Sequence, residues 1–526
     1  MNVSPVPNNR KTRARKIRQD AAQFAFSQPH PEHQNNGEEN DHPFIANYSK
    51  GLRHDDSGEV RQADYQKLLT AVTSGKPADF DAIPLGGTRK LTSPQAGMAY
   101  DLEGPDAQAV VTRQSAGKHI SIRPAPRIDS PENSAEMAEL YWMALLRDVN
   151  FTAFATDTGV AKAANSLTLE FTDFKGPKDP TSGAVTHATL FRGIYPGELD
   201  GPYISQFLLK DIPYGSLTIS QRQTTVVAGI DYMTDYNSWL AVQRGDDRRG
   251  RDRFDVDITG QINPRYIRNM RDLAHYVHVD QLYEAYLNAC LILLAMNAEA
   301  DPGNPYVGSS NQEGFAVFGG PHILSLLTEV ATRALKAVWF QKWFVHRRLR
   351  PEAFGGRIHN HKTEVKKYPI DAEILDSSVL DDVFDKHGTY LLPQAFPEGS
   401  PTHPAYGAGH ATVAGACVTI LKAWFKEDQP FPEPVVPDVH GTSLEPYVVP
   451  GASPLTVGGE LNKVAGNIAI GRNMAGVHWR TDYTESLKLG EAVAIGILEE
   501  QAESYNEKMS FSLTKFDGTS ITISNS

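Results

Sequence analysis

The chain has 526 residues, of which 40% are hydrophobic and 22% charged, a composition typical of a globular protein with a sizeable core. Its 51 lysines and arginines against 63 aspartates and glutamates give a net charge of −12, which argues against nucleic acid as a general partner. No run of about 18 apolar residues occurs, so we predict no membrane span. The two cysteines, Cys290 and Cys417, cannot build a disulfide framework and are predicted to be buried thiols.

The N-terminal region differs from the rest of the chain. Residues 1–45 are polar and contain several prolines, which predicts a flexible arm that is solvated or wraps a neighbouring subunit. The basic cluster Arg10–Lys16 is not followed by an apolar run of signal length, so no secretory signal is predicted and an intracellular location is the default. Residues 46–526 are predicted to form one mostly helical domain, in which residues 46–130 supply covering loops and at most a short hairpin.

Helical periodicity dominates the remaining sequence, because apolar residues recur at three- and four-residue spacing. The predicted helices span residues 133–146, 157–173, 232–244, 263–278, 279–297, 321–347, 409–426, 460–472 and 484–506. The segments between them are predicted as a weak hairpin at 218–227, a glycine-rich loop at 301–320, an irregular stretch at 351–399, a proline-rich linker at 427–457 and a β-like tail at 510–523. The predicted fold class is therefore mainly α, a helical bundle with a few short strands.

Three short stretches within residues 339–482 combine fixed cations, histidines and glycine turns. They contain, in order, Lys342 and Arg350; the turn Gly407-Ala408-Gly409-His410; and Arg472, His478 and Asp482. An arginine fork pairs two oxygens of a tetrahedral anion, and the amides of a glycine turn at a helix start also bind anions. Together the three stretches favour a site for an oxyanion such as phosphate or vanadate.

Each stretch taken alone also fits a plainer interpretation. Arg347, Arg348 and Arg350 suit a solvated helix end, where cations complement the helix dipole. The glycine turn suits an ordinary helix start, and His478 suits a partly buried structural histidine. Asp482, four residues later, would hold one imidazole nitrogen of His478 protonated and leave the other as a lone pair, able to bind a metal or attack phosphorus.

The three motifs Lys-x7-Arg-Pro, Gly-Ala-Gly-His and Arg-x5-His-x3-Asp resemble the signature of the vanadium-dependent haloperoxidases, which acid phosphatases of the phosphatidic acid phosphatase type share. Longer stretches at 201–206, 317–324, 400–404, 415–421 and 460–478 resemble the bromoperoxidases of marine red algae and cyanobacteria, and the similarity runs from about residue 44 to the end. The resemblance implies the helical-bundle haloperoxidase fold and a vanadate cofactor.

The resemblance also implies a role for each matching position. The vanadate oxygens would be bound by Lys342, Arg350, Ala408, Gly409, His410 and Arg472. His478 would bind vanadium axially, with Asp482 supporting its imidazole. The positions expected to act in catalysis are Lys342, His403 and His410. Trp339 and His403 would line the halide pocket, where a histidine favours bromide over chloride.

The implied reaction is the oxidation of bromide by hydrogen peroxide to a species like hypobromous acid, which then halogenates small electron-rich organic molecules. The family resemblance further implies a homo-oligomer, with paired subunits assembling into a dodecamer. Some relatives hold a structural Ca²⁺, which here would fall in the loop Asp301–Glu313, although a plain loop is the stronger interpretation of that segment.

One position departs from the family pattern, because Ala408 stands where a serine is usual. A lost hydrogen bond to a charged group costs roughly 1.5–3 kcal/mol, which is about one to two decades in affinity. We therefore expect weaker vanadate binding rather than none. Two alternatives stay open at this stage: a phosphatase with His478 as nucleophile and His410 as general acid, and a homologue with a degenerate, weakly vanadate-binding site.

Overall fold

The computed structural model describes residues 33–98, 120–449, 453–502 and 504–525, together with residues 11, 12, 15, 16, 19, 20 and 23. Most of the predicted arm 1–45, and residues 99–119 of the predicted covering loops 46–130, lie outside the described residues. Among the described helices, none combines the length and the apolar character needed to cross a membrane.

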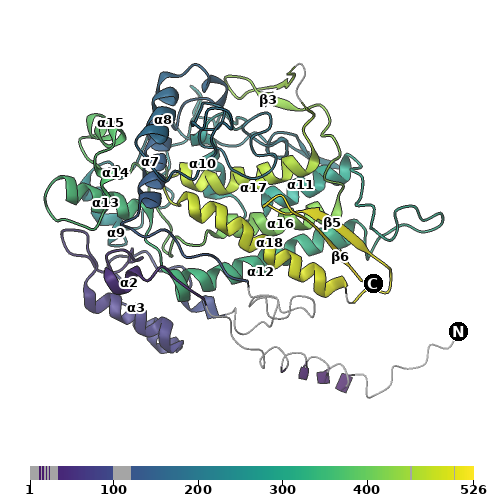
Figure 1. The fold of residues 1–526 in the computed structure, drawn as a ribbon, viewed down its shortest axis with the longest axis horizontal. Coiled ribbons are helices and arrows are strands. Elements are labelled where there is room, and N and C mark those ends of the chain that lie inside the picture. Colours follow the sequence, from purple (N-terminus) through teal and green to yellow (C-terminus); the bar gives the residue numbers. More distant parts are fainter. Residues whose placement is uncertain are drawn as a thin grey trace.

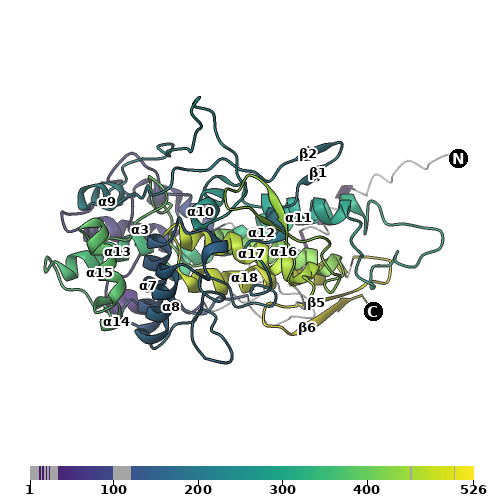
Figure 2. The same cartoon turned by 90° about the horizontal axis from the view of Figure 1, so that it is seen from above.

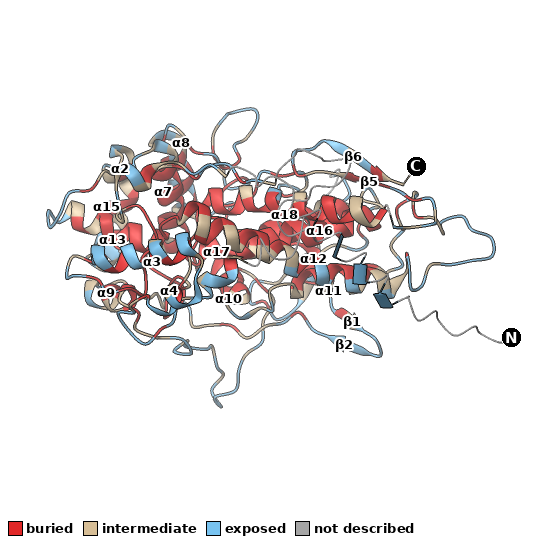
Figure 3. Cartoon of the chain, turned by 90° about the horizontal axis from the view of Figure 1, so that it is seen from below, coloured by how far each residue is buried: buried red, intermediate tan, exposed pale blue. Residues whose placement is uncertain are grey.

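A bundle of long helices forms the centre of the molecule (Figure 1). It consists of α12 (Gly320–Phe340), α16 (Gly409–Trp424), α17 (Val457–Met474) and α18 (Arg480–Ala502), and α10 (Met270–Val279) packs on α17. Helix α16 is the innermost, since it contacts α12, α17 and α18. Figure 2 shows the same helices side by side from above, and Figure 3 shows that α16, α17 and α18 are mostly buried, whereas α12 also carries exposed residues. The mainly α bundle predicted from the sequence is confirmed.

The sequence of α16 explains its central position. Every residue of this helix except His410 is buried, because apolar and small side chains occupy all of its faces. Two glycines allow α18 to approach closely: a Cβ on Gly415 would lie 2.1 Å from the carbonyl oxygen of Leu487, and a Cβ on Gly490 would lie 1.9 Å from that of Thr412. Backbone-to-backbone packing of this kind fixes the position of α16 along α18. It therefore also fixes the predicted turn 407–410, which lies at the start of α16.

The remaining elements surround this bundle. The other described helices of eight or more residues are α3 (Gln62–Ser74), α7 (Pro131–Leu145), α8 (Thr158–Leu169), α9 (Tyr236–Gln243), α11 (Glu284–Ala295), α13 (Pro351–Lys362) and α15 (Ser378–His387). The shorter α-helices are α2 (Glu38–Asp41), α4 (Pro77–Asp81) and α14 (Ala372–Leu375). Three antiparallel hairpins pair β1 (Ile212–Tyr214) with β2 (Leu217–Ile219), β3 (Val435–Pro437) with β4 (Leu444–Pro446), and β5 (Ser510–Thr514) with β6 (Ser520–Ser524). In Figure 1, α13, α14 and α15 gather at one end of the bundle and β5–β6 at the other.

Two regions predicted as irregular contain helices. Residues 351–399 hold α13, α14 and α15, and residues 46–130 hold the 13-residue helix α3. Polar residues and histidines in α13 obscured its pattern, because nine of its twelve residues are buried and two of the buried ones, Glu352 and Arg357, are charged. The burial of α3 rests on Tyr65, Leu68 and Val72, at three- and four-residue spacing. The irregular interpretation of both regions was wrong.

Several predicted boundaries also shift for local reasons. Helix α10 begins at Met270 rather than 263, because the Asn269 side chain accepts a hydrogen bond from the amide of Asp272 and caps it. Residues 279–297 do not form one helix, since the chain is extended at Asp280 and α11 starts only at Glu284. The long helix predicted to reach 347 ends in a π-helical turn, Gln341–His346.

The smaller predictions fare differently. The hairpin predicted at 218–227 is centred earlier, because Gly215 (φ 61°) supplies the left-handed turn between β1 and β2. The proline-rich segment 427–457 contains β3 and β4, so it is not merely a linker. The β-like tail is confirmed as β5–β6, and both cysteines are free and buried, as predicted.

We predict that Gly490→Ala lowers the unfolding midpoint of the protein. The added Cβ would meet the Thr412 carbonyl and the Ala416 amide, both backbone atoms, so α16 and α18 must separate, at a cost of about 1–3 kcal/mol. Thermal unfolding followed by circular dichroism measures the change. Gly320→Ala is the matched control, because a Cβ there meets nothing within 4 Å; equal midpoints for the two variants would contradict the close-packing argument.

Candidate active site

The three motifs meet at one end of the central helices. Lys342 lies in the π-helical turn that follows α12, and Arg350 immediately precedes α13. The turn 407–410 forms the start of α16. Arg472 lies in the last turn of α17. His478 lies in the short link between α17 and α18. The ends of four helices thus bring together residues up to 136 positions apart in the sequence.

Three cations are buried in this site. Lys342 donates to the carbonyl oxygens of Pro404 and Ala405 at 2.9 and 3.0 Å, and its side chain is fully buried. Arg350 is 1% exposed and donates to the carbonyls of His403 and Val477. Arg472 donates to the Val277 carbonyl at 2.6 Å. Their described hydrogen bonds go to neutral groups rather than to carboxylates, so the site holds buried positive charge that an anion would compensate.

The guanidinium of Arg350 fixes the protonation of two histidines. One of its N–H groups lies 2.9 Å from Nε2 of His478 and another lies 3.0 Å from Nδ1 of His403. Because a guanidinium can only donate, both ring nitrogens must carry lone pairs. Nδ1 of His478 lies 2.7 Å from Oδ2 of Asp482 and therefore bears the proton. His478 thus presents a free Nε2 lone pair to the cation cluster, the form of histidine that binds a metal.

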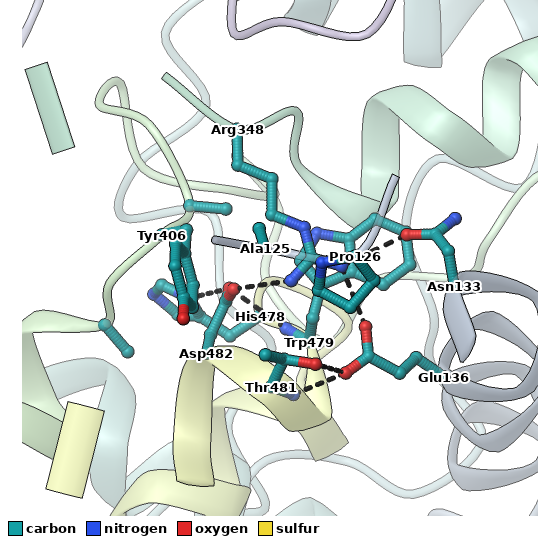
Figure 4. A network of polar contacts seen from close by, with 12 residues as sticks. Ala125, Pro126, Asn133, Glu136, Arg348, Tyr406, His478, Trp479, Thr481 and Asp482 are labelled. Carbon is teal, nitrogen blue, oxygen red and sulfur yellow. Dashed lines mark hydrogen bonds and ion pairs between the residues drawn. The ribbon is translucent and has the colours of Figure 1, made fainter. Parts of the chain in front are cut away.

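The carboxylate of Asp482 is itself held by a buried network (Figure 4). Arg348 donates to Asp482 Oδ1 at 3.0 Å and to Glu136 at 2.8 Å, and Thr481 donates its hydroxyl to Glu136. The backbone amide of Trp479 donates to Asp482 Oδ2 at 3.1 Å. This network joins the end of the first motif to the start of α18, so the orientation of His478 depends on Arg348.

Burial changes the proton affinities of these groups. Desolvation, aided by the neighbouring cations, lowers the pKa of His478, His403 and Lys342 well below their ordinary values. Both imidazoles are therefore neutral at pH 7, in agreement with the lone pairs that Arg350 requires. Desolvation raises the pKa of Asp482, and the charge of Arg348 opposes that shift.

The turn at the start of α16 contributes backbone rather than side chains. The amide of Ala408 donates to the hydroxyl of Ser486 at 2.8 Å, and the methyl group of Ala408 belongs to the hydrophobic core. Gly409 lines the cavity and is the first residue of α16. The amides of a first helical turn have no intrahelical partner, so they are available to an anion in the cavity.

A cavity of about 300 Å³ opens onto the cluster. Its walls carry His410, whose Nε2 lies 3.0 Å from Oδ1 of Asp280, and His403, whose ring lies 4.7 Å from that of Trp339. Trp339 donates its indole N–H to the Ser93 carbonyl at 3.0 Å. The other predicted positions that face this cavity are Gly409, Arg472 and His478. Lys342, Arg350 and Asp482 lie behind this wall and contact its residues.

Known proteins are similar in sequence to this chain over most of its length. A family model described as the VCPO second helical-bundle domain matches residues 323–507. A vanadium-dependent bromoperoxidase of Corallina officinalis is 41% identical over 95% of this chain and 94% of that protein, and one of Ascophyllum nodosum is 35% identical over 93% and 87%. The chain belongs to the vanadium-dependent bromoperoxidase family. The solved homohexameric structure of the second vanadate-dependent bromoperoxidase (AnII) of A. nodosum has a TM-score of 0.89 at 32% identity, covering 99% of this chain and 92% of that one.

Membership of the bromoperoxidase family makes the chain an enzyme of the haloperoxidase class and favours that interpretation over a phosphatase. The relatives' dependence on vanadium agrees with the predicted vanadate cofactor. The plain interpretation of Arg347, Arg348 and Arg350 as a solvated helix end was wrong, because Arg348 and Arg350 are buried and Arg347 pairs with Glu39.

Some supporting residues of this site belong to none of the three motifs. Glu352 accepts hydrogen bonds from Lys50 at 2.9 Å and from the amide of Ser400 at 2.6 Å, and so anchors the loop that carries His403. Asp280, which holds His410, lies 130 residues away in sequence. Glu352 stands two residues after Arg350, and this proximity was an available signal. No sequence signal marks Asp280, because a lone aspartate between two helical segments is common.

We predict that Arg348→Met destabilises the protein strongly. The substitution keeps the length of the side chain but leaves the buried carboxylates of Glu136 and Asp482 without their cation, a change that costs about 3–5 kcal/mol when one partner of a buried pair is lost. Urea unfolding followed by tryptophan fluorescence measures it.

Arg249→Met is the control for this measurement. Its exposed ion pair with Asp247 contributes about 0–1 kcal/mol. If Arg348→Met unfolded at the same urea concentration as this control, the network in Figure 4 would not stabilise the folded protein.

Proposed function

We propose that this chain oxidises bromide with hydrogen peroxide at a vanadate bound beside His478. The observation that supports this most directly is the neutral His478 with its Nε2 lone pair directed at buried cations whose described hydrogen bonds reach no carboxylate. A metal cation would be repelled there, whereas a metal oxyanion satisfies the lone pair and the cations together.

The residues present fit vanadate. The Nε atom of Arg472 is buried and has no hydrogen-bond partner in the described structure, which is the expected condition of a donor reserved for a ligand. In the proposal Lys342, Arg350 and Arg472 bind the vanadate oxygens, the Gly409 amide donates to one of them, and His478 Nε2 binds vanadium. Binding requires the Arg350 N–H group to turn from His478 Nε2 to an oxygen. Ala408 supplies no hydroxyl, and its amide already donates to the Ser486 hydroxyl.

Vanadate, when bound, supplies Lewis-acid activation of peroxide without changing oxidation state. The chain holds and moves protons around it. His410, oriented by Asp280, faces the cavity, where it would donate a hydrogen bond to an oxygen of the bound group and could exchange a proton with hydrogen peroxide. His403, neutral and bonded through Nδ1, presents its remaining edge beside Trp339. Lys342, buried beside the site, would supply positive charge that stabilises negative charge on the oxygens of the bound group.

The cavity wall suits bromide and small organic molecules. Leu282, Leu335, Phe396 and Trp339 supply apolar surface, which a large and weakly hydrated anion tolerates better than a small one. A cavity of about 300 Å³ is at the lower limit of small-molecule sites, so the organic substrates in this proposal are small. The oxidant formed from bromide then halogenates them.

Assembly and the second predicted metal complete the proposal. A homohexameric relative supports a homo-oligomer, and the arrangement of paired subunits in a dodecamer stays a prediction. The Ca²⁺ predicted at Asp301–Glu313 also stays a prediction. Asp301 accepts hydrogen bonds from the amides of Gly303 and Ser512, which ties this loop to β5 without an ion.

We predict that His478→Ala abolishes vanadate-dependent bromination. Loss of the metal ligand should weaken vanadate binding beyond the roughly 10–100-fold that follows removal of a residue that merely orients a ligand. The measurement is bromination of a phenolic dye by the apo-protein with peroxide and bromide, titrated with orthovanadate in phosphate-free buffer, together with calorimetric vanadate binding.

His440→Ala controls for loss of a histidine, since His440 is exposed. If the wild-type protein hydrolysed phosphate esters without brominating the dye, it would be a phosphatase. If it had neither activity, the site would be degenerate. Wild-type activity retained in His478→Ala would place the metal elsewhere.

We predict that Ala408→Ser tightens vanadate binding about 10–100-fold, the worth of one hydrogen bond of roughly 1.5–3 kcal/mol to a charged group. Vanadate titration of apo-protein by calorimetry measures it. Ala408→Val, which adds bulk without a hydroxyl, is the control. An unchanged affinity in Ala408→Ser would mean that the side chain at 408 points only into the core, where the Ala408 methyl group packs.

A further inference from the structure

A second group of metal-binding side chains lies at the wall of the same cavity, outside the three motifs. Asp252, His275 and His278 each offer a ligand atom, and these atoms lie within 4.8 Å of one another. His275 and His278 are three residues apart on α10, so their rings project from one face of that helix. Asp252 reaches them from the loop between α9 and α10. Of the three, His278 lines the cavity.

The tautomer of His278 is set by a neighbouring carboxylate. Its Nε2 lies 2.8 Å from Oε1 of Glu398, which is short enough for a charge-assisted hydrogen bond and places the proton on Nε2. Its Nδ1 is buried and has no hydrogen-bond partner in the described structure. Asp252 Oδ1 lies 3.5 Å from Nδ1, beyond the usual length of such a bond. An imidazole that donates one N–H to a carboxylate and leaves its other nitrogen unsatisfied is the arrangement found at metal centres.

Packing holds both rings in place. The His278 ring stacks on Phe396 with centroids 3.8 Å apart and planes 9° apart. The His275 ring meets Phe254 edge-on at 5.9 Å, and its side chain is buried. Rings fixed in this way lose little further freedom when they bind an ion. The surroundings are also electronegative, because Asp252 and Glu398 both lie against His278.

We propose that Asp252, His275 and His278 bind a divalent transition-metal cation of the zinc type. Two imidazoles and one carboxylate are a ligand set that Zn²⁺ takes, with a fourth position left for water. With metal–ligand bonds of about 2.0–2.2 Å, ligand atoms at tetrahedral angles lie about 3.3–3.6 Å apart. Ligand atoms up to 4.8 Å apart must therefore approach by at most about 1.5 Å, through rotation of the ligand side chains. Glu398 orients His278 without touching the metal. This site is distinct from the vanadate site and its binding does not depend on the proposed function.

The test uses the full-length protein freed of metals and of vanadate by chelation. Calorimetric titration with ZnCl₂ is expected to give one site per chain, and Co²⁺ in its place is expected to give the visible absorption bands of a low-coordinate histidine site. His275→Ala and Asp252→Asn should each weaken Zn²⁺ binding at least 100-fold. Glu398→Gln should weaken it about 10–100-fold, since it removes only an orienting partner.

The matched control is His478→Ala, which removes a histidine from the other side of the cavity and should leave Zn²⁺ affinity unchanged. Circular dichroism checks that each variant is folded. Two results would overturn the proposal. One is a Zn²⁺ affinity that His275→Ala leaves intact. The other is the absence of binding at micromolar Zn²⁺, in which case His278 is an imidazolium held between Asp252 and Glu398.

Discussion

Buried positive charge whose described hydrogen bonds reach no carboxylate is the constraint on which the rest of this structure depends. Lys342, Arg350 and Arg472 are buried together, and the groups that receive their hydrogen bonds are carbonyl oxygens and imidazole nitrogens. Such an arrangement is costly in the absence of an anion. The surrounding helices hold this arrangement rigidly, and in the proposed function its cost would become binding free energy when a tetrahedral oxyanion enters.

The rigidity comes from two sources of different kind. Close backbone packing at Gly415 and Gly490 sets α16 against α18, so the start of one helix and the start of the other keep a fixed separation. Buried ion pairs then lock the connecting loops: Arg348 binds the start of α18 through Asp482, and Glu352 binds the loop that carries His403 through the Ser400 amide. Packing positions the backbone, and the charge network orients the side chains.

Part of this arrangement could be predicted from the sequence. The long apolar helices and the motif residues from Lys342 to Asp482 can be recognised in the sequence, because both are patterns of residues at short, fixed spacings. Helix α13 did not, since charged residues such as Glu352 and Arg357 are buried in it and disguise its inner face. Asp280 and Arg348 owe their importance to contacts 130 and 134 residues away, which no local pattern records. The break at Asp280 reflects tertiary packing that overrides helical propensity.

The hydrogen bond from Arg350 to His478 Nε2 has a consequence for selectivity. While no oxyanion is present, the guanidinium shields the one nitrogen that would bind a metal, and its charge opposes the approach of any free divalent ion. An incoming species must carry enough negative charge to draw Arg350 aside before the imidazole becomes accessible. The pocket therefore selects species by their net charge rather than by the identity of the metal that they contain. Common cellular cations are excluded from His478, even though its ring is neutral and its Nε2 carries a lone pair.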